Sequence, residues 1–326
     1  MNQRTLRALA PLVAVTLVAT VPLAVSDRFL LRILTFAGIN ALVVVGLALL
    51  FGHAGQVSLG HAAFVGLGAY ACAYCTVRLG WPWLAGFAAA GTLAAVGGLV
   101  LAMPSLRLRG HYLAMATLGF GELMALTFTE AEPVTGGVDG FGGIPFPALG
   151  PLEVREAAAL YWLVWAIVGI ALLAALNLTS LRPGRAMRAL HGSEPGAHAC
   201  GVDVVGVKVR TFVTSALLAG LAGALYASVV GFVSPSVFTL TASVTLLAMA
   251  VLGGTGSLAG PLVAAVLLTV VQYLNAIIPG LPRETARLIQ SYQEDIYGLA
   301  IVLVVIFAPQ GLAGLWRRRT KGDAAP

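Results

Sequence analysis

Charged side chains are scarce in this sequence. Only 10% of its 326 residues are Asp, Glu, Lys or Arg, against about 25% in a typical soluble domain. Hydrophobic residues make up 59% of the chain, and the mean hydropathy is +0.93. So few charges cannot cover the surface of a soluble protein of this length. A disordered or disulfide-rich secreted chain is excluded as well. The composition therefore predicts an integral membrane protein.

The residues that bind metals and carry redox chemistry are also few. Cys72 and Cys75 form a C-x-x-C pair inside an apolar run, which favours small residues of a membrane helix over a redox pair. The five histidines show no zinc-ligand spacing. We therefore predict no metal site and no cofactor. Basic residues interleaved with aromatics are missing too, which argues against nucleic acid as a partner.

Lysine is nearly absent, and this bears on ATP hydrolysis. A P-loop needs a glycine-rich stretch that ends in G-K-[ST]. The two lysines are Lys208, between valines, and Lys321, between Thr320 and Gly322. The chain therefore does not hydrolyse ATP by that route. The G-x-S-x-G elbow of hydrolases and the zincin motif are missing as well, so we expect no catalytic residues and no enzyme activity.

Long apolar runs are what the sequence has in abundance. A membrane-spanning helix needs about 20 mostly apolar residues. That measure predicts an all-α polytopic membrane protein, a single transmembrane domain over residues 1–326, with about ten spans. The first run also has features of a signal peptide, but we expect it to be kept as an anchor. The spans are placed near 8–26, 29–51, 57–78, 83–103, 111–130, 157–178, 211–231, 241–256, 258–275 and 295–314.

The distribution of charge between the loops predicts the orientation. Basic residues gather on the cytoplasmic side of membrane proteins. With the N-terminus inside, 13 of the 19 basic residues fall in inner segments, whereas five acids share one outer loop. Both termini are then cytoplasmic, which requires an even number of spans and agrees with ten. The five acids are Glu130, Glu132, Asp139, Glu153 and Glu156.

Two loops exceed the usual length of a connection. The outer loop, about 131–156, contains a glycine-rich stretch with Gly137 and Asp139. The inner loop, about 179–210, is basic and contains a short helix that starts at Ser193 or Glu194 and ends near Gly201. This helix is either a rigid element that projects from the membrane or part of a solvated loop that carries the cytoplasmic charge. A cytosolic tail of about 315–326 follows the last span.

Glycines interrupt two of the apolar runs. The segments 52–61 and 253–261 each contain Gly, then Ser-Leu, then Gly. Such breaks in corresponding halves of a chain indicate an internal repeat, with interrupted or re-entrant helices lining a path. The alternative is a pair of tight turns between spans. Under the first reading, the candidate path residues are Gln56, Ser58, His61, Gly254 and Ser257.

Glu122 is the only acid deep inside a predicted span. An ionisable residue there is costly unless it is paired or solvated, so Glu122 is either a further path residue or a structural hydrogen-bonding group. A proton-driven transporter would need several such groups. The span at 211–231 has small residues at every fourth position, which indicates close helix packing. These are Ser215, Ala219, Gly223 and Ala227.

Several motifs in a fixed order resemble one family between Leu34 and Arg318. The chain is similar to the LivM-type membrane subunits of branched-chain amino acid ABC importers. The motifs run Gly55–Phe64 (GQVSLGHAAF), Ala116–Glu122 (ATLGFGE), Thr135–Gly140 (TGGVDG), Gly184–Ala189 (GRAMRA), Ala219–Tyr226 (AGLAGALY), Val251–Pro261 and Phe307–Leu312 (FAPQGL).

The resemblance implies a permease subunit in a bacterial inner membrane that works with other proteins. These would be a second similar permease, two cytosolic ATPase subunits and a periplasmic solute-binding protein. The inner loop then corresponds to the coupling loop that docks on the ATPase, with Arg185, Arg188, Glu194 and Gly201. Pro195 and Gly196 stand where the family has alanines. Gly137 and Asp139 would contact the binding protein.

Three other readings stay open on the residues alone. One is a permease for urea or short-chain amides, which belongs to related importers. The others are a self-contained secondary transporter and a polytopic membrane enzyme. The long basic inner loop favours an importer subunit, because a self-contained carrier has no partner to dock. The sequence does not name the solute or the second permease.

Overall fold

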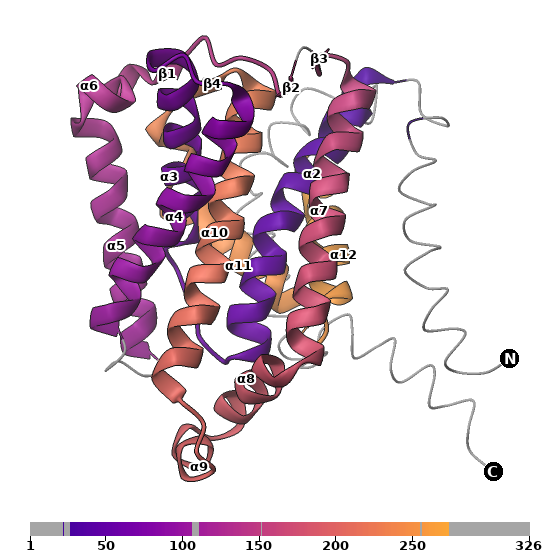
Figure 1. Cartoon of the computed structure of the whole chain (residues 1–326). Coiled ribbons are helices and arrows are strands. Elements are labelled where there is room, and N and C mark those ends of the chain that lie inside the picture. The colour runs from indigo at the N-terminus through magenta and orange to yellow at the C-terminus, as the bar shows by residue number, and fades with distance from the viewer. Residues whose placement is uncertain (1–21, 23–26, 106–110, 151, 255, 274–326) are drawn as a thin grey trace, which may run out of the picture.

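The computed structural model of the chain describes residues 22, 27–105, 111–150, 152–254 and 256–273. Within them the fold is a bundle of eight longer helices (Figure 1). Two short π-helical segments, η1 (Ala48–His53) and η2 (Tyr74–Arg78), extend α2 and α3. The eight helices are α2 (Arg28–Leu47), α3 (His61–Ala73), α4 (Trp83–Ser105), α5 (His111–Glu130), α7 (Ala157–Ser180), α10 (Val204–Val230), α11 (Leu240–Gly253) and α12 (Ala259–Gln272).

Six helical segments of the described chain are long and apolar enough to cross a membrane. The protein is therefore an all-α polytopic membrane protein, as its composition predicts. They are Arg28–His53, Trp83–Met103, His111–Glu130, Ala157–Ser180, Val204–Val230 and Pro235–Gly253. The two remaining predicted spans of this part correspond to α3 and to the shorter apolar α12. The predicted spans 8–26 and 295–314 lie outside the described residues.

The two ends of the bundle differ. One end, which we call the loop end, carries the short helices α6 (Glu132–Thr135) and η3 (Gly137–Asp139) and several short strands (Figure 1). There β1 (Phe141–Gly142) pairs antiparallel with β4 (Phe232–Val233), and β2 (Ala148–Leu149) with β3 (Leu152–Glu153). The 3₁₀ turn η4 (Pro235–Val237) leads from β4 into α11. At the opposite end, α8 (Arg182–Gly192) and α9 (Glu194–Ala199) project from the bundle.

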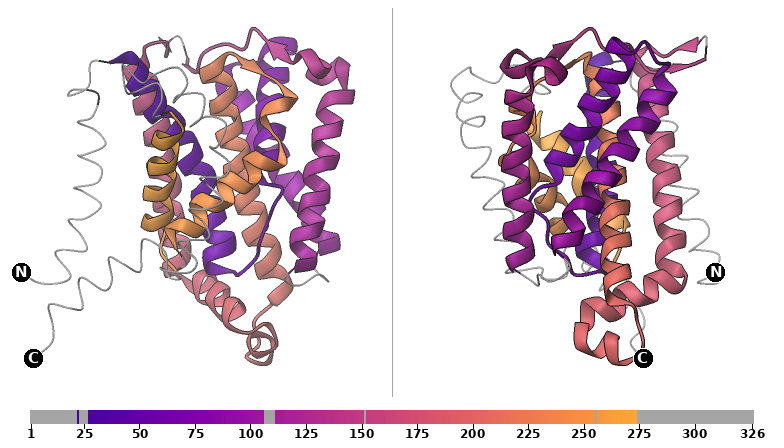
Figure 2. Two further views of the ribbon diagram at one scale, coloured as in Figure 1. Left: turned by 180° about the vertical axis from the view of Figure 1, so that it is seen from behind. Right: turned by 60° about the vertical axis from the view of Figure 1, so that its left-hand side comes forward.

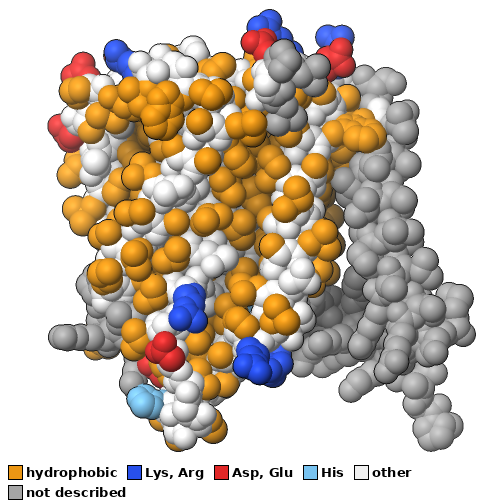
Figure 3. All heavy atoms as spheres, viewed as in Figure 1, with side chains coloured by type: hydrophobic (Ala, Val, Ile, Leu, Met, Phe, Trp, Pro, Cys, Tyr) orange, Lys and Arg blue, Asp and Glu red, His pale blue; other side chains and the backbone are white. Residues whose placement is uncertain are grey.

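The surface between the two ends is apolar. In Figure 3 hydrophobic side chains cover the flank of the bundle, whereas the charged side chains of this face gather at the loop end and near α8 and α9. Large exposed apolar residues on the flank include Val100, Met115 and Ile170. An apolar band with polar ends is the surface that a bilayer requires.

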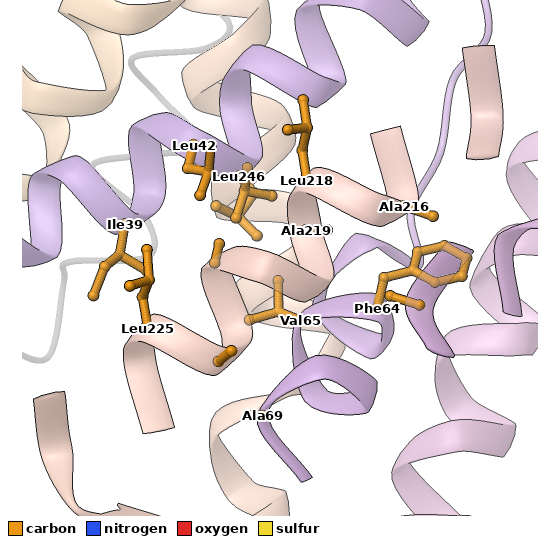
Figure 4. Close-up of a cluster of buried hydrophobic side chains, with 14 of the residues drawn as sticks. Ile39, Leu42, Phe64, Val65, Ala69, Ala216, Leu218, Ala219, Leu225 and Leu246 are labelled. Carbon is orange, nitrogen blue, oxygen red and sulfur yellow. The ribbon is translucent and has the colours of Figure 1, made fainter. Parts of the chain in front are cut away.

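Helix α10 lies at the centre of the packing and contacts α4, α3 and α2. Its small residues Ser215, Ala219, Gly223 and Ala227 are all buried. A Cβ at Gly223 would overlap the carbonyl oxygen of Val65 on α3, so only glycine permits this approach. Figure 4 shows side chains of α2, α3, α10 and α11 meeting in this core. The predicted packing role of the four small residues is confirmed.

Two irregular segments interrupt the helices. The chain leaves η1 at Ala54 and resumes helical structure only at His61, so α3 starts part-way along the bundle (Figure 2). We call residues 54–60 the break segment. A second interruption separates α11, which ends at Gly253, from α12, which begins at Ala259. Both lie where the sequence predicts interrupted spans; an internal repeat between the halves remains a prediction.

Candidate functional site

His61 joins the break segment to the central helix. Its Nδ1 lies 2.8 Å from Ser58 Oγ, and its Nε2 lies 2.8 Å from Ser215 Oγ on α10. All three side chains are fully buried. Because both ring nitrogens are engaged, the imidazole is held in one orientation and ties the start of α3 to α10. Two of the predicted path residues, Ser58 and His61, are thus in direct contact.

Two further hydroxyl groups hold the start of α3. Thr117 of α5 accepts a hydrogen bond from Leu59 N at 2.9 Å, and Ser243 of α11 accepts one from Ala62 N at 3.0 Å. A Cβ at Gly60 would overlap the carbonyl oxygen of Thr117. Backbone groups freed from a helix at membrane depth must find such partners. Four elements therefore meet at this point: the break segment, α5, α10 and α11.

Gln56 is buried in the break segment, and its Nε2 has no hydrogen-bond partner within the described structure. Its neighbour Gly55 has a positive φ of 68°. A Cβ at Gly55 would lie 3.0 Å from Nδ1 of His191 on α8. The break segment is therefore packed against the projecting element at the α8–α9 end.

Glu122 lies on the exposed side of α5, one turn beyond Thr117. It borders a shallow depression that Leu59 of the break segment and Ser243 of α11 also line. Within the described residues Glu122 forms no hydrogen bond or ion pair, so the bundle does not satisfy its carboxylate. Gly254 closes α11 with a φ of 94°, and Ser257 is half-buried in the turn that follows.

A cavity of about 700 Å³ opens between α2, α3, α10, α11 and α12. Its apolar wall includes Ile39, Val65 and Leu246, which are also among the core side chains of Figure 4. Its polar lining comes from residues that the sequence analysis does not single out. These are Asn40, Tyr226, Thr239, Thr241, Thr245, Gln272 and Tyr273.

None of the predicted path residues is among the described residues that line this cavity. The sequence gives only a weak signal for this cavity. Asn40 is a lone amide within an apolar run, and Thr241 and Thr245 stand one helical turn apart on α11. Such polar positions inside apolar spans usually face a protein interior or a cavity. They come from distant parts of the chain, so only the fold brings them together.

The projecting element is built as the sequence predicts. Ser193 caps α9 and accepts a hydrogen bond from Gly196 N at 3.2 Å, and Pro195 occupies the first turn. Of the two predicted starts of the short helix, Ser193 and Glu194, the helix begins at Glu194. Glu194 Oε1 forms a salt bridge of 2.7 Å with Lys208 Nζ on α10, and both side chains are largely buried. The helix is thereby fastened to the central helix of the bundle.

A small apolar cluster lies beneath α8 and α9. It joins Met187, Leu190 and Ala197 of the projecting element to Val204 of α10 and Ala54 of the break segment. One rigid unit thus contains the start of α10, the projecting element and the first residue of the break.

The other predicted coupling residues have different surroundings. Arg188 donates from Nη1 to the carbonyl oxygen of Thr179 at 2.9 Å, which caps the end of α7. Arg185 is exposed to solvent. Gly201 adopts a φ of 75° in the turn after α9. Such backbone favours glycine. Among the described residues the guanidinium of Arg185 has no hydrogen-bond partner, whereas that of Arg188 does, so the guanidinium of Arg185 is available to a partner.

The loop end presents its residues on a constrained backbone. Gly137 is buried with a φ of 64°, and a Cβ at Gly140 would overlap the carbonyl oxygen of Val233. Asp139 is exposed between them, and Val138 is 75% exposed. The glycines therefore shape the loop, and it is Asp139 and Val138 that offer side chains to a partner.

The chain is similar to a known protein family over most of its length. A family profile described as the permease component of the branched-chain amino acid transport system matches residues 29–306. The chain belongs to this permease family. The match runs from the second residue of α2 through all the later helices described above.

Individual relatives agree with the family profile. The permease is 33% identical to the high-affinity branched-chain amino acid transport system permease protein LivM of Escherichia coli K12, over 94% of this chain and 76% of the relative. It is 24% identical to LivH of Salmonella typhimurium, over 86% of this chain and 92% of the relative. A probable LivM of Methanocaldococcus jannaschii is 26% identical over 68% of this chain. No solved structure matches the permease.

Proposed function

We propose that this permease forms part of the translocation path for branched-chain amino acids in an ATP-driven importer of a bacterial inner membrane. The observation that carries the proposal is the family match over residues 29–306, supported by relatives whose names specify branched-chain amino acid transport. The alternative is a urea or short-chain amide importer. A comparison of uptake for several solutes distinguishes the two.

Four kinds of partner complete the proposed transporter: a second similar permease, two cytosolic ATPase subunits, a periplasmic solute-binding protein and the lipid bilayer. Two observations support the proposal that partner subunits hydrolyse ATP and this chain carries the solute. The chain lacks a P-loop lysine, and α8 and α9 project from one end of the bundle. A projecting, capped helix that is fastened to the core suits the transfer of force from an ATPase.

The charges support an orientation for the proposed transporter. The projecting element and the start of α10 contain Arg182, Arg185, Arg188, Lys208 and Arg210, whereas the loop end carries the acidic segment from Glu130 to Glu156. Because basic loops stay in the cytoplasm, the α8–α9 end faces the ATPases and the loop end faces the binding protein. Ten spans, with an internal repeat, would place both termini in the cytoplasm.

The break segment is the proposed junction between the path and the ATPases. It contacts His191 of α8 at one end and is bound to α10 through His61 at the other. Gln56, Ser58 and His61, with Glu122 nearby and Gly254 and Ser257 at the second break, would rearrange when the coupling element moves. Arg185, Glu194 and Gly201 would belong to the coupling element itself, and Asp139 to the surface for the binding protein.

The test is a solute panel on the complete transporter. The permease is purified with its cognate partners, and uptake of radiolabelled leucine, isoleucine, valine, lysine, glutamate and urea is compared in proteoliposomes. We expect ATP-dependent uptake of the three branched-chain amino acids only. Uptake of urea in preference to leucine would contradict the proposed solute.

A further inference from the structure

We propose that the cavity between α2, α3, α10, α11 and α12 is a solute-binding site that accepts neutral aliphatic amino acids and rejects charged side chains. The inference rests on the proposed function, because it places the solute of that transporter at a defined point of this chain. It assigns specificity to the permease itself in addition to any that a binding protein provides.

The size of the cavity suits a small solute. Its volume of about 700 Å³ falls within the range of about 300–1,000 Å³ that is typical of small-molecule sites. The cavity reaches from Thr239, at the start of α11 near the loop end, to Met249 in the second half of α11. A solute that enters from the loop end would therefore be carried well into the bundle.

One wall matches an aliphatic side chain. Ile39 and Val43 of α2, Val65 of α3, and Leu246 and Met249 of α11 line it. All five are buried core residues. Figure 4 shows Ile39 beside Leu225, and Leu246 near Leu42, so this wall is backed by further packed side chains. Such a wall stabilises a branched apolar group by removing its surface from water.

The remaining lining is polar but neutral. Amide and hydroxyl groups of Asn40, Thr241 and Gln272 can donate to a carboxylate, and their oxygens, with that of the Thr245 hydroxyl, can accept from an ammonium group. Asn40 is itself oriented, because its Nδ2 donates to Thr269 Oγ1 at 3.0 Å. The ammonium and carboxylate groups of an amino acid thus find hydrogen-bonding partners in this lining. Their opposite charges give no net charge.

A third charge meets no counter-ion among the described residues of the lining. Among the described residues that line the cavity there is no Asp, Glu, Lys, Arg or His. Burial of an unpaired charge in such surroundings is strongly unfavourable. Against this described lining, lysine and glutamate would each bring one side-chain charge without a counter-ion, whereas leucine would not. The neutral described lining therefore disfavours charged side chains.

Four aromatic rings line one part of the cavity and contact one another. Phe36 stacks on Tyr273 with ring centroids 6.2 Å apart, and Tyr226 contacts both Phe36 and Phe238 at 6.1 Å. All four rings line the cavity. Because each ring is held by another, this part of the cavity wall is preformed.

Two adjacent residues of α11 give a matched pair for experiment. Thr245 lines the cavity and is half-buried, and its hydroxyl donates to the carbonyl oxygen of Thr241 at 2.9 Å. Val244 is 41% exposed and is not part of the lining. The same change at both positions separates an effect on the cavity from an effect on α11.

The first experiment measures binding without transport. Thr245→Cys and Val244→Cys are introduced singly into the complete detergent-purified complex, and labelling by a small neutral maleimide is compared with that of the unmodified complex, which accounts for the native cysteines. We expect L-leucine to slow labelling at position 245 several-fold, with no effect at 244. L-lysine and L-glutamate should not protect. Equal protection by all three, or by none, would overturn the proposal.

The second experiment measures uptake. Thr245→Trp would fill the cavity and should lower leucine uptake roughly tenfold or more, whereas Val244→Trp should stay within about twofold of the unmodified complex. Equal uptake by the two variants would overturn the site. Failure of the unmodified complex to take up leucine would instead contradict the proposed function. In that case protection from labelling by leucine still decides whether the cavity binds it.

Discussion

Single polar side chains carry much of the order in this apolar bundle. The ring of His61 engages Ser58 and Ser215, and Thr117 and Ser243 bind the backbone on either side of it. In a bilayer the hydrophobic effect does not drive helices together, so such hydrogen bonds and close packing decide how they associate. The hydroxyls of Ser215, Thr117 and Ser243 connect three different helices, α10, α5 and α11, to the start of α3.

Loss of one of these groups should be measurable. We expect Ser215→Ala to lower the free energy of unfolding by about 1 kcal/mol, because it removes an interhelical hydrogen bond. The neighbour Thr214 bonds only to the carbonyl oxygen of Arg210 on its own helix, so Thr214→Ala should cost less than about 0.5 kcal/mol. Thermal unfolding of the purified permease in detergent measures both. Equal losses would show that the His61 contact contributes no stability.

Glu122 differs from these residues because no described residue bonds to its carboxylate. An ionised carboxylate in mid-span costs several kcal/mol if lipid surrounds it, so water or another polar group must meet it. If Glu122 belongs to the path, Glu122→Gln should lower leucine uptake while the complex still assembles and the isolated permease keeps its melting temperature. Loss of co-purification with the second permease would instead assign Glu122 to that interface.

At the scale of elements, α3 and α10 depend on glycine. Gly223 admits the backbone of α3, and a Cβ at Gly68 on α3 would overlap the carbonyl oxygen of Gly220 on α10. The two helices therefore touch along their backbones. This contact places the break segment against α10 and so brings His61 to Ser215.

Substitution of one such glycine should separate the helices. Gly223→Ala forces a methyl group onto Val65, and overpacking of this kind costs about 1–3 kcal/mol. Gly169 of α7 has open space where its Cβ would be, so Gly169→Ala should be neutral or stabilise α7 slightly. The melting temperatures of Gly223→Ala and Gly169→Ala, measured in the same detergent, are compared with that of the unmodified permease. A neutral Gly223→Ala would contradict the close α3–α10 contact.

The projecting element is fastened to the bundle by the pair of Glu194 and Lys208. Glu194→Lys should uncouple ATP hydrolysis from uptake, because two positive charges would then meet in a largely buried site. If Glu194 acts by positioning α9 on α10, the double change with Lys208→Glu restores the pair and most of the coupling. If Glu194 instead contacts the ATPase directly, the double variant stays uncoupled. The ratio of ATP hydrolysed to leucine transported distinguishes the two.

The sequence predicts these elements unequally well. Long apolar runs locate the helices, because each run satisfies its own backbone and needs no distant partner. Ser193 and Glu194 identify the start of α9, and the paired glycines at 253 and 254 identify the end of α11. All of these signals are local.

Contacts across the fold are not predicted in the same way. Ser215 is recognised as a small packing residue, yet its bond to His61 spans 154 positions of the chain. Glu194 is expected at an ATPase, and its pairing with Lys208 becomes visible only when α9 folds back on α10. The cavity is missed for the same reason, since five helices contribute its walls.

At the scale of the whole molecule, the permease is a path with two different ends. An apolar flank faces the membrane, a glycine-shaped loop with Asp139 occupies one end, and a fastened helix pair projects from the other. The break segment contacts both the projecting pair and the core. Within the described chain no clusters of His, Cys, Asp or Glu that could hold a metal ion occur. This architecture suits a subunit that is moved by its partners.

The central claim is that the permease transports only as a subunit of an ATP-driven complex. Leucine uptake into proteoliposomes is the most direct test, with the permease reconstituted alone, with the second permease, and with the ATPase subunits and the binding protein added. The account predicts uptake only in the complete complex and only with hydrolysable ATP. Clear leucine uptake by the permease alone would contradict it.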